Sequence, residues 1–581
     1  MLGVLLQETA RHRDAVGPLQ RAVELIGLGP GAAEARYNLA TALGSLGRYG
    51  EAADRLKESL RLRPDFPAAW QYLGIALAGS GRPDQAAGAH RRAIQLRPDY
   101  PEAHNHLGDA LRALGRLGEA ENEHREAIRL KPDYPPAYNS LAATLSLLGR
   151  AEEVVACFRK LVELRPQSPV TGSDLLAVLH NVDGVAPQEM FQEHVRWAER
   201  HARPLYKTAA PRGAADSDRD PNRRLRVGYV SPDFREYPAA RFFEPLLAGH
   251  DREKVEVFCY SDVTRPDAVT ARLRAYGCTW RDIGGLPDER VEQMVREDRI
   301  DILVDLAGHM SNPRLLLFAR RPAPVQVSYL GYPDTTGLPT IDYRITDEWH
   351  DPPGMSEAYH TEELVRLPRC CWSYGPGKDL PTVGALAADS SGVFTFGIMS
   401  RLVKVTPRMM GLWARILTAV PSSRLMVLVA RGVETEPSVR ERFTAAGVGA
   451  DRLAFLAHRP RREYLELFGQ VDLALDTFPY CGMTTTSDAL WMGVPTVTLS
   501  GQTHVSRTGV SILHAVGLAE LVAQTADEYV DIAVALARDV PRLRELRAGM
   551  RERVRASDLS NGTGLAAAIE TAFRQMWAVR H

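Results

Sequence analysis

Long hydrophobic runs are missing from this sequence of 581 residues. A membrane-spanning helix needs about 18 or more consecutive apolar residues, and no such stretch occurs. The apolar start of "MLGVLLQETARHRD" covers only six residues and has no basic region before it, which is too short for a signal peptide. We therefore expect a cytoplasmic protein that neither crosses nor coats a membrane.

An excess of charge of either sign is also missing. The chain has 71 Lys and Arg against 72 Asp and Glu, so its formal net charge is -1. Nucleic-acid binders and membrane-surface proteins usually show a basic excess, so we expect neither kind of partner. Cysteine is scarce and has no metal-ligand spacing, which predicts free thiols and no metal site. The six cysteines are Cys157, Cys259, Cys278, Cys370, Cys371 and Cys481.

A repeat of 34 residues fills the first part of the chain. Four units follow one another without an insertion, at 34–67, 68–101, 102–135 and 136–169. Each unit has an apolar helical stretch, a Leu-Gly-Arg or Ser-Gly-Arg turn, a second helical stretch, and a final Arg-Pro or Lys-Pro. This period predicts an α-solenoid of tetratricopeptide repeats over residues 1–169, about five in number. In the repeat at 68–101 the tetratricopeptide signature positions hold Trp70, Leu73, Gly74, Leu77, Ala86, Ala93 and Pro98.

A solenoid of this kind presents a concave surface that suits an extended polypeptide. The array therefore predicts a protein or peptide partner. The alternative is a rigid spacer or an arm that forms a homodimer, because fold alone does not define function.

Alternating strand and helix patterns fill the rest of the chain. We expect a helical connector and exposed linker at 170–222, an α/β lobe at 223–388, a second lobe at 389–555, and a C-terminal helix at 556–581. Short apolar strands separated by helices predict two doubly wound parallel sheets, which bind ligands at the carboxyl ends of their strands and in the cleft between lobes. Neither lobe carries a dinucleotide-binding Gly-x-Gly-x-x-Gly or a P-loop, which disfavours an oxidoreductase and a P-loop nucleotidase.

Three consecutive threonines stand where a helix is expected to follow a strand. In "VDLALDTFPYCGMTTTSDALWMGVP", Thr484, Thr485 and Thr486 would open the helix, where backbone N–H groups lack partners within the helix. These amides, the hydroxyls and the helix dipole predict a phosphate or diphosphate site. The alternative is an ordinary helix cap, which needs only one hydroxyl and no ligand.

A second loop adds positive charge. In "FGIMSRLVKVTPRMMGLWARIL", Arg401 and Lys404 lie between a strand and a helix that should begin at Pro407. Two cations at the mouth of a cleft would stabilise the negative charge that develops on a leaving diphosphate. The alternative is a pair of solvated side chains on a loop.

The order of these parts resembles the O-linked N-acetylglucosamine transferases and their SPINDLY relatives, glycosyltransferase family 41. The resemblance covers nearly the whole chain, and its most specific segments are 224–234, 321–347, 402–417, 475–480, 484–501 and 506–513. It implies a GT-B fold and a protein O-glycosyltransferase that inverts the sugar linkage. It also implies a nucleotide-sugar donor, with UDP-GlcNAc favoured, and neither a metal ion nor a cofactor.

The resemblance also assigns roles to single residues. Lys404 would act on the leaving diphosphate, Thr484 and Thr485 on phosphate oxygens, and Asp488 on the ribose. The full donor-binding set that we expect, from the resemblance and the patterns above, is Arg401, Lys404, Arg461, Tyr464, Met483, Thr484, Thr485, Thr486, Asp488 and His309. The set expected on the sugar and acceptor side is Leu330, Gly331, Tyr332, Pro333 and Arg241.

The sequence departs from the family at the reaction centre. Tyr237 stands where many members carry a histidine, and Met483 ends the segment in which the family often has Asn-Gly-His. A tyrosine with an ordinary pKa near 10 is a poor base at neutral pH. The catalytic candidates are therefore Lys404, Tyr237 and Asp298, with His309 also expected near the cleft.

The repeat array departs as well. Family solenoids carry an asparagine ladder on the concave face, whereas the equivalent positions here are Asn38, Tyr72, His106 and Ser140. Together the departures leave two alternatives to the O-GlcNAc transferase. One is a SPINDLY-like O-fucosyltransferase that uses GDP-fucose, and the other is a catalytically weak scaffold that binds partners through its repeats.

Overall fold

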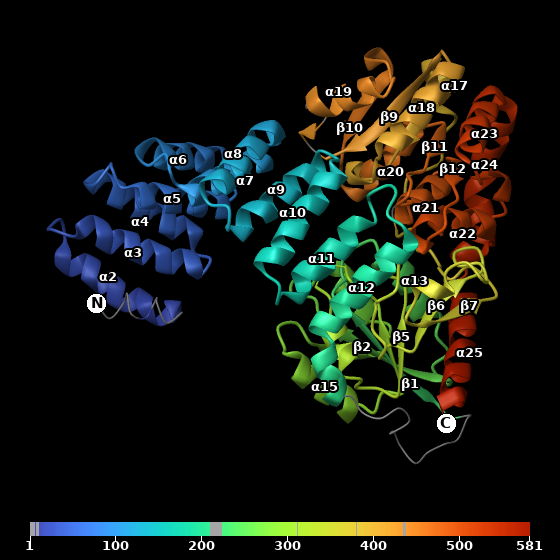
Figure 1. Cartoon of the computed structure of the whole chain (residues 1–581), viewed down its shortest axis with the longest axis horizontal. Helices are drawn as coiled ribbons and strands as arrows, with labels where there is room; N and C mark the ends of the chain where they lie inside the picture. Colours follow the sequence, from blue (N-terminus) through green and yellow to red (C-terminus); the bar gives the residue numbers. More distant parts are fainter. Residues whose placement is uncertain are drawn as a thin grey trace. The chain divides into compact units, whose positions relative to one another are not determined.

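The computed structural model describes Leu6 and residues 11–208, 223–310, 312–378, 380–430, 432–433 and 437–580 (Figure 1). The exposed linker expected before residue 223 lies almost entirely outside these residues. The chain divides into two compact units, Met1–Leu164 with Ala430–Val439, and Arg165–Val429 with Arg440–His581. Each unit is described by itself below.

Paired helices form the first unit, as the 34-residue period predicts. Each repeat contributes two helices of 13 or 14 residues, and successive pairs stack on one another, so the α-solenoid is confirmed. The helices are α2 (His12–Ile26), α3 (Ala32–Ser45), α4 (Tyr49–Leu62), α5 (Pro67–Gly79), α6 (Pro83–Leu96), α7 (Pro101–Ala113), α8 (Leu117–Leu130), α9 (Pro135–Leu147) and α10 (Ala151–Leu164).

The glycine in each repeat turn has a conformational reason. The four turn glycines all have positive φ, between 72° and 76°, a region open to glycine at little steric cost. After each one, the arginine N–H bonds back to the leucine carbonyl five residues earlier, as in Arg48 to Leu43 at 2.9 Å. The turn motif that marks the repeats is therefore a helix stop. Its glycines are Gly47, Gly81, Gly115 and Gly149.

Two further contacts recur with the same period. A polar ring at the start of α5, α7 and α9 bonds to a proline carbonyl six residues earlier, for example from Trp70 to Pro64 at 2.8 Å and from Tyr138 to Pro132 at 3.1 Å. A cation also covers the aromatic residue before each of these three helices, for example Arg97 at 3.4 Å from the ring centre of Tyr100. These repeated contacts fix the angle at which one repeat enters the next.

Two histidines are buried where paired helices of the array approach most closely. His90 packs on Gly74 and His124 packs on Gly108, and a Cβ atom at either glycine would lie within 2.4 Å of the imidazole. Nδ1–H of His90 donates a hydrogen bond to the side-chain oxygen of Gln71, at 2.7 Å. Burial lowers the pKa of His90 to about 3 and that of His124 to about 4. Both rings are therefore neutral in the folded array.

Acid should destabilise this part of the array. The pKa of a histidine in the unfolded chain is near 6.5. The contribution of these two neutral histidines to stability is therefore fully present above that pH, and it is lost as the pH falls from 6.5 toward 4. At pH 5 the expected loss is about 2 kcal/mol for each of the two histidines. Hydrogen exchange of the full chain should show α6, α7 and α8 losing protection between pH 7 and 5. A His90→Phe/His124→Phe variant with the same pH response as the parent would contradict this assignment.

Within the second unit, a seven-stranded parallel sheet forms the core of the first lobe. Its strand order is β3-β2-β1-β4-β5-β6-β7, and β1 pairs with β2 from Leu225↔Val255 to Ser231↔Ser261. The short apolar strands expected in this lobe are present, and their pairings are all parallel. The elements are β1 (Leu225–Ser231), α13 (Ala240–Gly249), β2 (Val255–Ser261), α14 (Ala268–Arg274), β3 (Thr279–Asp282), α15 (Asp288–Glu297), β4 (Ile302–Asp305), α16 (Leu315–Ala319), β5 (Val325–Ser328), β6 (Tyr343–Asp347), η2 (Glu357–Tyr359) and β7 (Glu363–Leu367).

A six-stranded parallel sheet forms the second lobe, in the order β10-β9-β8-β11-β12-β13. With the array before it, this two-lobed α/β arrangement confirms the predicted fold class. The elements are α17 (Ala387–Ser391), β8 (Phe394–Ile398), η3 (Leu402–Lys404), α18 (Pro407–Ala419), β9 (Ser423–Val429), α19 (Pro437–Ala445), η5 (Ala450–Arg452), β10 (Leu453–Ala457), α20 (Arg461–Glu466), η6 (Leu467–Gln470), β11 (Leu473–Leu475), α21 (Thr484–Trp491), β12 (Thr496–Leu499), η7 (His504–Arg507), α22 (Thr508–Ala515), η8 (Ala519–Leu521), β13 (Val522–Ala523), α23 (Ala526–Arg538), α24 (Val540–Ala556) and η9 (Asp558–Ser560).

The segments before and after the two sheets both pack on the first lobe. The helices α11 (Pro169–Leu179) and α12 (Pro187–His201), with η1 (Arg203–Thr208), belong to the second unit. The connector expected from residue 170 is helical in its described part, and it packs on the first lobe, where Ser173 of α11 bonds to His309 at 2.9 Å. The C-terminal helix α25 (Gly562–Arg580) packs on α13, where Glu570 bonds to His250 at 2.9 Å.

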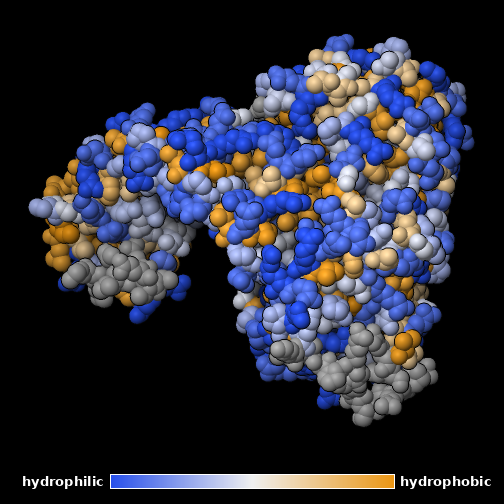
Figure 2. Space-filling view, viewed as in Figure 1, coloured by the Kyte–Doolittle hydropathy of each residue, from blue (hydrophilic) through white to orange (hydrophobic). Residues whose placement is uncertain are grey.

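Hydrophilic residues predominate on the visible face of the second unit, with hydrophobic residues scattered between them (Figure 2). Such a pattern is typical of a surface that faces water. Within the described part of the chain, no helix combines the length and the apolar character that a membrane span requires.

Candidate active site

The three threonines open α21, as the sequence predicts. The residue that caps this helix is Met483, whose side chain makes no capping hydrogen bond. An ordinary side-chain cap, the alternative considered for these residues, is therefore not what the structure shows. The hydroxyls of Thr485 and Thr486 face the preceding loop, since a Cβ at Gly482 would lie 2.1 Å and 3.1 Å from them. The α21 start thus combines first-turn amides, hydroxyls and the positive end of a helix dipole.

Lys404 joins this helix start to a second loop. It ends the short helix η3, and its Nζ donates to the carbonyl of Cys481 at 3.1 Å. The ammonium also lies 3.6 Å from the ring centre of Tyr480. Burial and the nearby Arg401 lower the pKa of Lys404 to about 7, against the opposing charge of Asp476. Arg401 itself is exposed just before η3, so both predicted cations lie on the expected loop.

Asp476 holds the loop that carries these groups, a role that the sequence analysis missed. Its Oδ1 accepts from the N–H of Gly482 at 2.7 Å, and its Oδ2 accepts from the hydroxyl of Thr498 at 2.9 Å. Burial raises the pKa of this carboxyl to about 6. The signal in the sequence was an aspartate directly after an apolar strand, in "LALDT". A residue directly after such a strand lies at the carboxyl end of the parallel sheet, where ligands bind.

The predicted nucleotide-binding residues lie together but are bound to one another. The guanidinium of Arg461 donates to both oxygens of Asp488, and it also donates to the hydroxyl of Tyr374 at 3.0 Å. Asp488 is fully buried, and Tyr374 donates to it as well. Tyr464 lies beside Arg461, whose guanidinium carbon is 5.7 Å from the centre of its ring. A ribose hydroxyl would have to share the Asp488 carboxylate with Arg461 and Tyr374.

Tyr237 and Arg241 lie on the first lobe, after β1. Burial raises the pKa of Tyr237 above its ordinary value, and the neighbouring Asp233 adds to the shift. The phenol is therefore protonated at neutral pH, where it donates a hydrogen bond rather than accepting a proton. Arg241 pairs with Glu236 at 2.6 Å. Its backbone carbonyl also accepts from the N–H of Gly375 at 2.7 Å, next to Tyr374 of the nucleotide-binding group.

The Leu-Gly-Tyr-Pro segment follows β5 at the same edge. Gly331 lies so close to Leu306 that a Cβ would be 1.9 Å from its carbonyl oxygen, and Leu330 adopts a positive φ of 71°. Leu330, Gly331 and Pro333 are half-buried. Tyr332 was also predicted to line the cleft, but it is buried with its hydroxyl 2.7 Å from a ring nitrogen of His194. That expectation is wrong for Tyr332, which anchors α12 instead.

The structure does not bring Asp298 to this edge. It ends α15, four residues before β4 begins, and therefore lies at the amino end of the sheet. Its carboxylate accepts from Arg281 at 2.7 Å and from the Tyr260 hydroxyl at 2.8 Å. The expectation that Asp298 lies near the cleft is wrong, because its backbone carbonyl accepts from Arg226, the second residue of β1, at the amino end of that strand. Asp298 is not part of the site.

His309 is at the correct end of β4 but is fully enclosed by protein. Its two ring nitrogens bond to the hydroxyl of Ser173 and to the carbonyl of Thr336, both at 2.9 Å. Burial, followed by the nearby His194, lowers its pKa well below the ordinary value. Its expected contact with a donor is not supported, because both nitrogens are used to dock α11 on the lobe.

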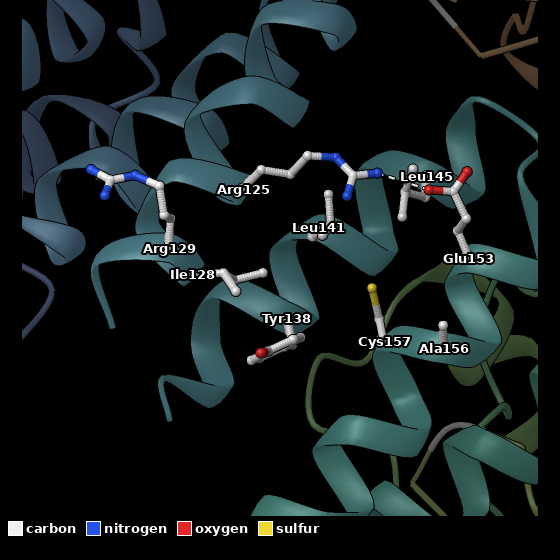
Figure 3. A pocket seen from close by; sticks show the side chains of 9 residues that line it. All are labelled: Arg125, Ile128, Arg129, Tyr138, Leu141, Leu145, Glu153, Ala156 and Cys157. Carbon is white, nitrogen blue, oxygen red and sulfur yellow. Dashed lines mark hydrogen bonds and ion pairs between the residues drawn. The ribbon is translucent and has the colours of Figure 1, made fainter. Parts of the chain in front are cut away.

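A surface pocket of about 360 Å³ lies within the repeat array, between α8, α9 and α10 (Figure 3). Leu141, Leu145 and Cys157 give it apolar walls, and Arg125 pairs with Glu153 at its rim. None of its lining residues belongs to the predicted site, so this pocket is a separate feature of the array.

Comparison with known proteins shows which family the chain resembles. The sequence model of glycosyl transferase family 41 matches residues 205–374 and 389–568, which is more than half of the chain. The chain belongs to glycosyl transferase family 41. Tetratricopeptide repeat models match residues 1–67, 37–101, 72–135 and 135–168 of this family 41 member.

Relatives within the family include a plant protein and a solved bacterial structure. The chain is 41% identical over 421 residues to the probable UDP-N-acetylglucosamine–peptide N-acetylglucosaminyltransferase SPINDLY of Arabidopsis thaliana, over 70% of this chain and 45% of that protein. It is 32% identical to the Arabidopsis protein of the same activity name called SEC, over 61% of this chain and 37% of that protein. A mutant O-GlcNAc transferase of Thermobaculum terrenum matches with a TM-score of 0.79 and 38% identity, covering 88% of this chain and 98% of that one. The chain spans about half the length of the curated relatives it matches.

Proposed function

We propose that this family 41 protein is a protein O-glycosyltransferase that moves a sugar from a nucleotide donor to Ser or Thr hydroxyls. One observation carries the proposal. The ammonium of Lys404 is 3.1 Å from the carbonyl of Cys481, three residues before the uncapped start of α21. A cation and a helix start at one place form a binding site for a diphosphate. A diphosphate is the leaving group of every nucleotide-diphosphate sugar.

The groups around this site suit loss of the leaving group. As the bond from the sugar to the diphosphate breaks, its electron pair moves onto a phosphate oxygen. Lys404 and the first-turn amides of Thr484, Thr485 and Thr486 would stabilise that charge, and Tyr237 would donate a hydrogen bond from the first lobe. The array would hold the acceptor polypeptide, in keeping with the protein-substrate names of the relatives.

The donor that we favour is UDP-GlcNAc, the donor named for the SPINDLY and SEC relatives. GDP-fucose is the second candidate. Met483 stands where O-GlcNAc transferases commonly have a histidine, and SPINDLY-like members also lack that histidine. Methionine offers only a weak thioether acceptor, so it cannot hydrogen-bond a phosphate as an imidazole does.

Calorimetric titration with UDP, UDP-GlcNAc, GDP and GDP-fucose tests the proposal. Tighter binding of the uridine pair, followed by transfer of GlcNAc to protein acceptors, is the expected result. Preference for the guanosine pair would assign the protein to fucose transfer. Failure of all four to bind would reject the proposed enzyme and favour a scaffold.

A further inference from the structure

Asp334 on the first lobe has a largely buried carboxylate, and within the described chain only one of its two oxygens makes a hydrogen bond. Asp334 follows the Leu-Gly-Tyr-Pro segment, and its side chain is 14% exposed. Its Oδ1 accepts from the N–H of Thr335 at 2.7 Å. Among the residues that the structure describes, this is the only hydrogen bond of the carboxylate, and Oδ2 lies 3.9 Å from Nε2 of His180. Oδ2 has no hydrogen bond to any described residue and is not among the fully enclosed polar atoms, so it is open to water or to a ligand.

The carboxylate of Asp334 is ionised at neutral pH. Burial raises its pKa, but His194, His180 and His360 around it outweigh burial and hold the pKa below its usual value. Burial lowers the pKa of His180 to about 4, so that ring is neutral. The site therefore contains an ionised carboxylate oxygen beside a neutral imidazole. The lowered pKa makes this carboxylate a weaker base than an ordinary one, so any role as proton acceptor depends on its position.

A chain of hydrogen bonds next to Asp334 directs the Nε2 proton of His180 to the hydroxyl of Tyr332 rather than to Asp334. Nδ1 of His194 lies 2.7 Å from the carbonyl of Met190, so it carries the proton and leaves Nε2 bare. The hydroxyl of Tyr332 then donates to that Nε2 at 2.7 Å and accepts from Nε2–H of His180 at 3.1 Å. His180 is thereby held in place without satisfying Asp334.

The backbone around Asp334 is held just as firmly. The side chain of Arg344 donates to the carbonyl oxygen of Asp334 at 2.7 Å and to that of Tyr332 at the same distance. The free oxygen is therefore a fixed feature of the loop rather than a result of poor anchoring.

Contacts connect this oxygen to the leaving-group cation. The ring of His180 meets that of Tyr480 edge-on, with centres 6.3 Å apart. The ring of Tyr480 in turn carries the ammonium of Lys404 at 3.6 Å. Asp334 and Lys404 are thus linked through His180 and Tyr480 without touching each other. An inverting transfer needs a base that is separate from the group stabilising the leaving diphosphate, and Asp334 is a carboxylate connected to that group.

We propose that Asp334 is the general base that takes the proton from the acceptor hydroxyl. In the step, the O–H bond of the serine or threonine breaks and its proton passes to Oδ2 of Asp334. The hydroxyl oxygen forms a bond to C1 of the sugar, while the bond from C1 to the diphosphate breaks and its electron pair leaves with the diphosphate. This inference rests on the proposed function, and it assigns the proton to a residue that the family resemblance did not supply.

Two variants of the full-length protein test the assignment. Asp334→Asn keeps the shape of the side chain but cannot take the proton, so turnover should fall about 100-fold while the Kd for the donor stays unchanged. Asp334→Ala should lose as much, and added sodium formate should restore part of its turnover by acting as a diffusible base. The control is Asp298→Asn, an aspartate with 12% exposure at the opposite end of the same sheet, whose turnover should stay near that of the parent.

Each outcome decides the matter. Turnover of Asp334→Asn within about twofold of the parent would overturn the assignment, as would an Asp334→Ala variant that formate does not rescue. The second result would make Asp334 a positioning residue for His180. Absence of sugar transfer by the parent protein with every donor would reject the proposed function and this base with it. An active parent with an active Asp334→Asn variant would reject the base alone.

Discussion

Replacing Lys404 by alanine should lower turnover about 100- to 1,000-fold, because the variant loses the only ammonium found against the α21 start in the described part of the chain. The charge on the leaving diphosphate is largest in the transition state, so the loss should fall mainly on kcat. The fold should survive, since Lys404 makes a single hydrogen bond and one contact with the ring of Tyr480. Steady-state kinetics with donor and acceptor, together with thermal denaturation, measure both effects.

A matched lysine gives the control for this variant. Lys254 is an exposed lysine just before β2, at the amino end of the first sheet, and it pairs with Asp251 on the surface. Lys254→Ala should therefore leave kcat unchanged. If Lys404→Ala kept turnover within a few-fold of the parent, Lys404 would not be the leaving-group cation.

Donor affinity should fall steeply as the pH rises above 7. Burial and Arg401 hold the pKa of Lys404 at about 7, so the free protein loses this charge just above neutrality. A bound diphosphate favours the charged form and should raise that pKa, so each complex takes up a proton at alkaline pH. The Kd should then increase about tenfold for each pH unit between 7 and the pKa of the complex.

Calorimetry in buffers with different ionisation enthalpies measures this proton uptake directly. The nucleotide sugar is the correct probe, because its two phosphates keep one charge each between pH 6.5 and 8.5. We expect nearly one proton per donor at pH 8.5 and almost none at pH 6. The Lys404→Ala variant should show no uptake at either pH. Uptake that persists in that variant would assign the proton to another group.

The repeat array was predictable because its contacts are local. The period of 34 residues, the turn glycines and the proline stops act within one or two repeats. Gly81 has the positive φ that its turn requires, and Trp70 bonds to a carbonyl only six residues away. Short-range interactions of this kind can be inferred from residue spacing alone.

The candidate site was predictable in part. The place of Thr484 at a helix start and the place of Lys404 on a loop both follow from strand and helix patterns. The mutual binding of Arg461 and Asp488 was not predictable, because it depends on how α20 and α21 meet. The prediction for Asp298 was wrong for a similar reason, since the direction of β4 decides at which end of the sheet a neighbouring residue lies.

By itself, the sequence determined the solenoid, the two parallel sheets and the cationic helix start, because periodicity and residue spacing encode local geometry. Only the tertiary structure decided which side chains are free to act. Tyr332 is used up between two histidines from α11 and α12, whereas Asp334, two residues later, keeps one oxygen open. That difference arises from contacts between segments about 140 or more residues apart, which spacing along the chain does not record.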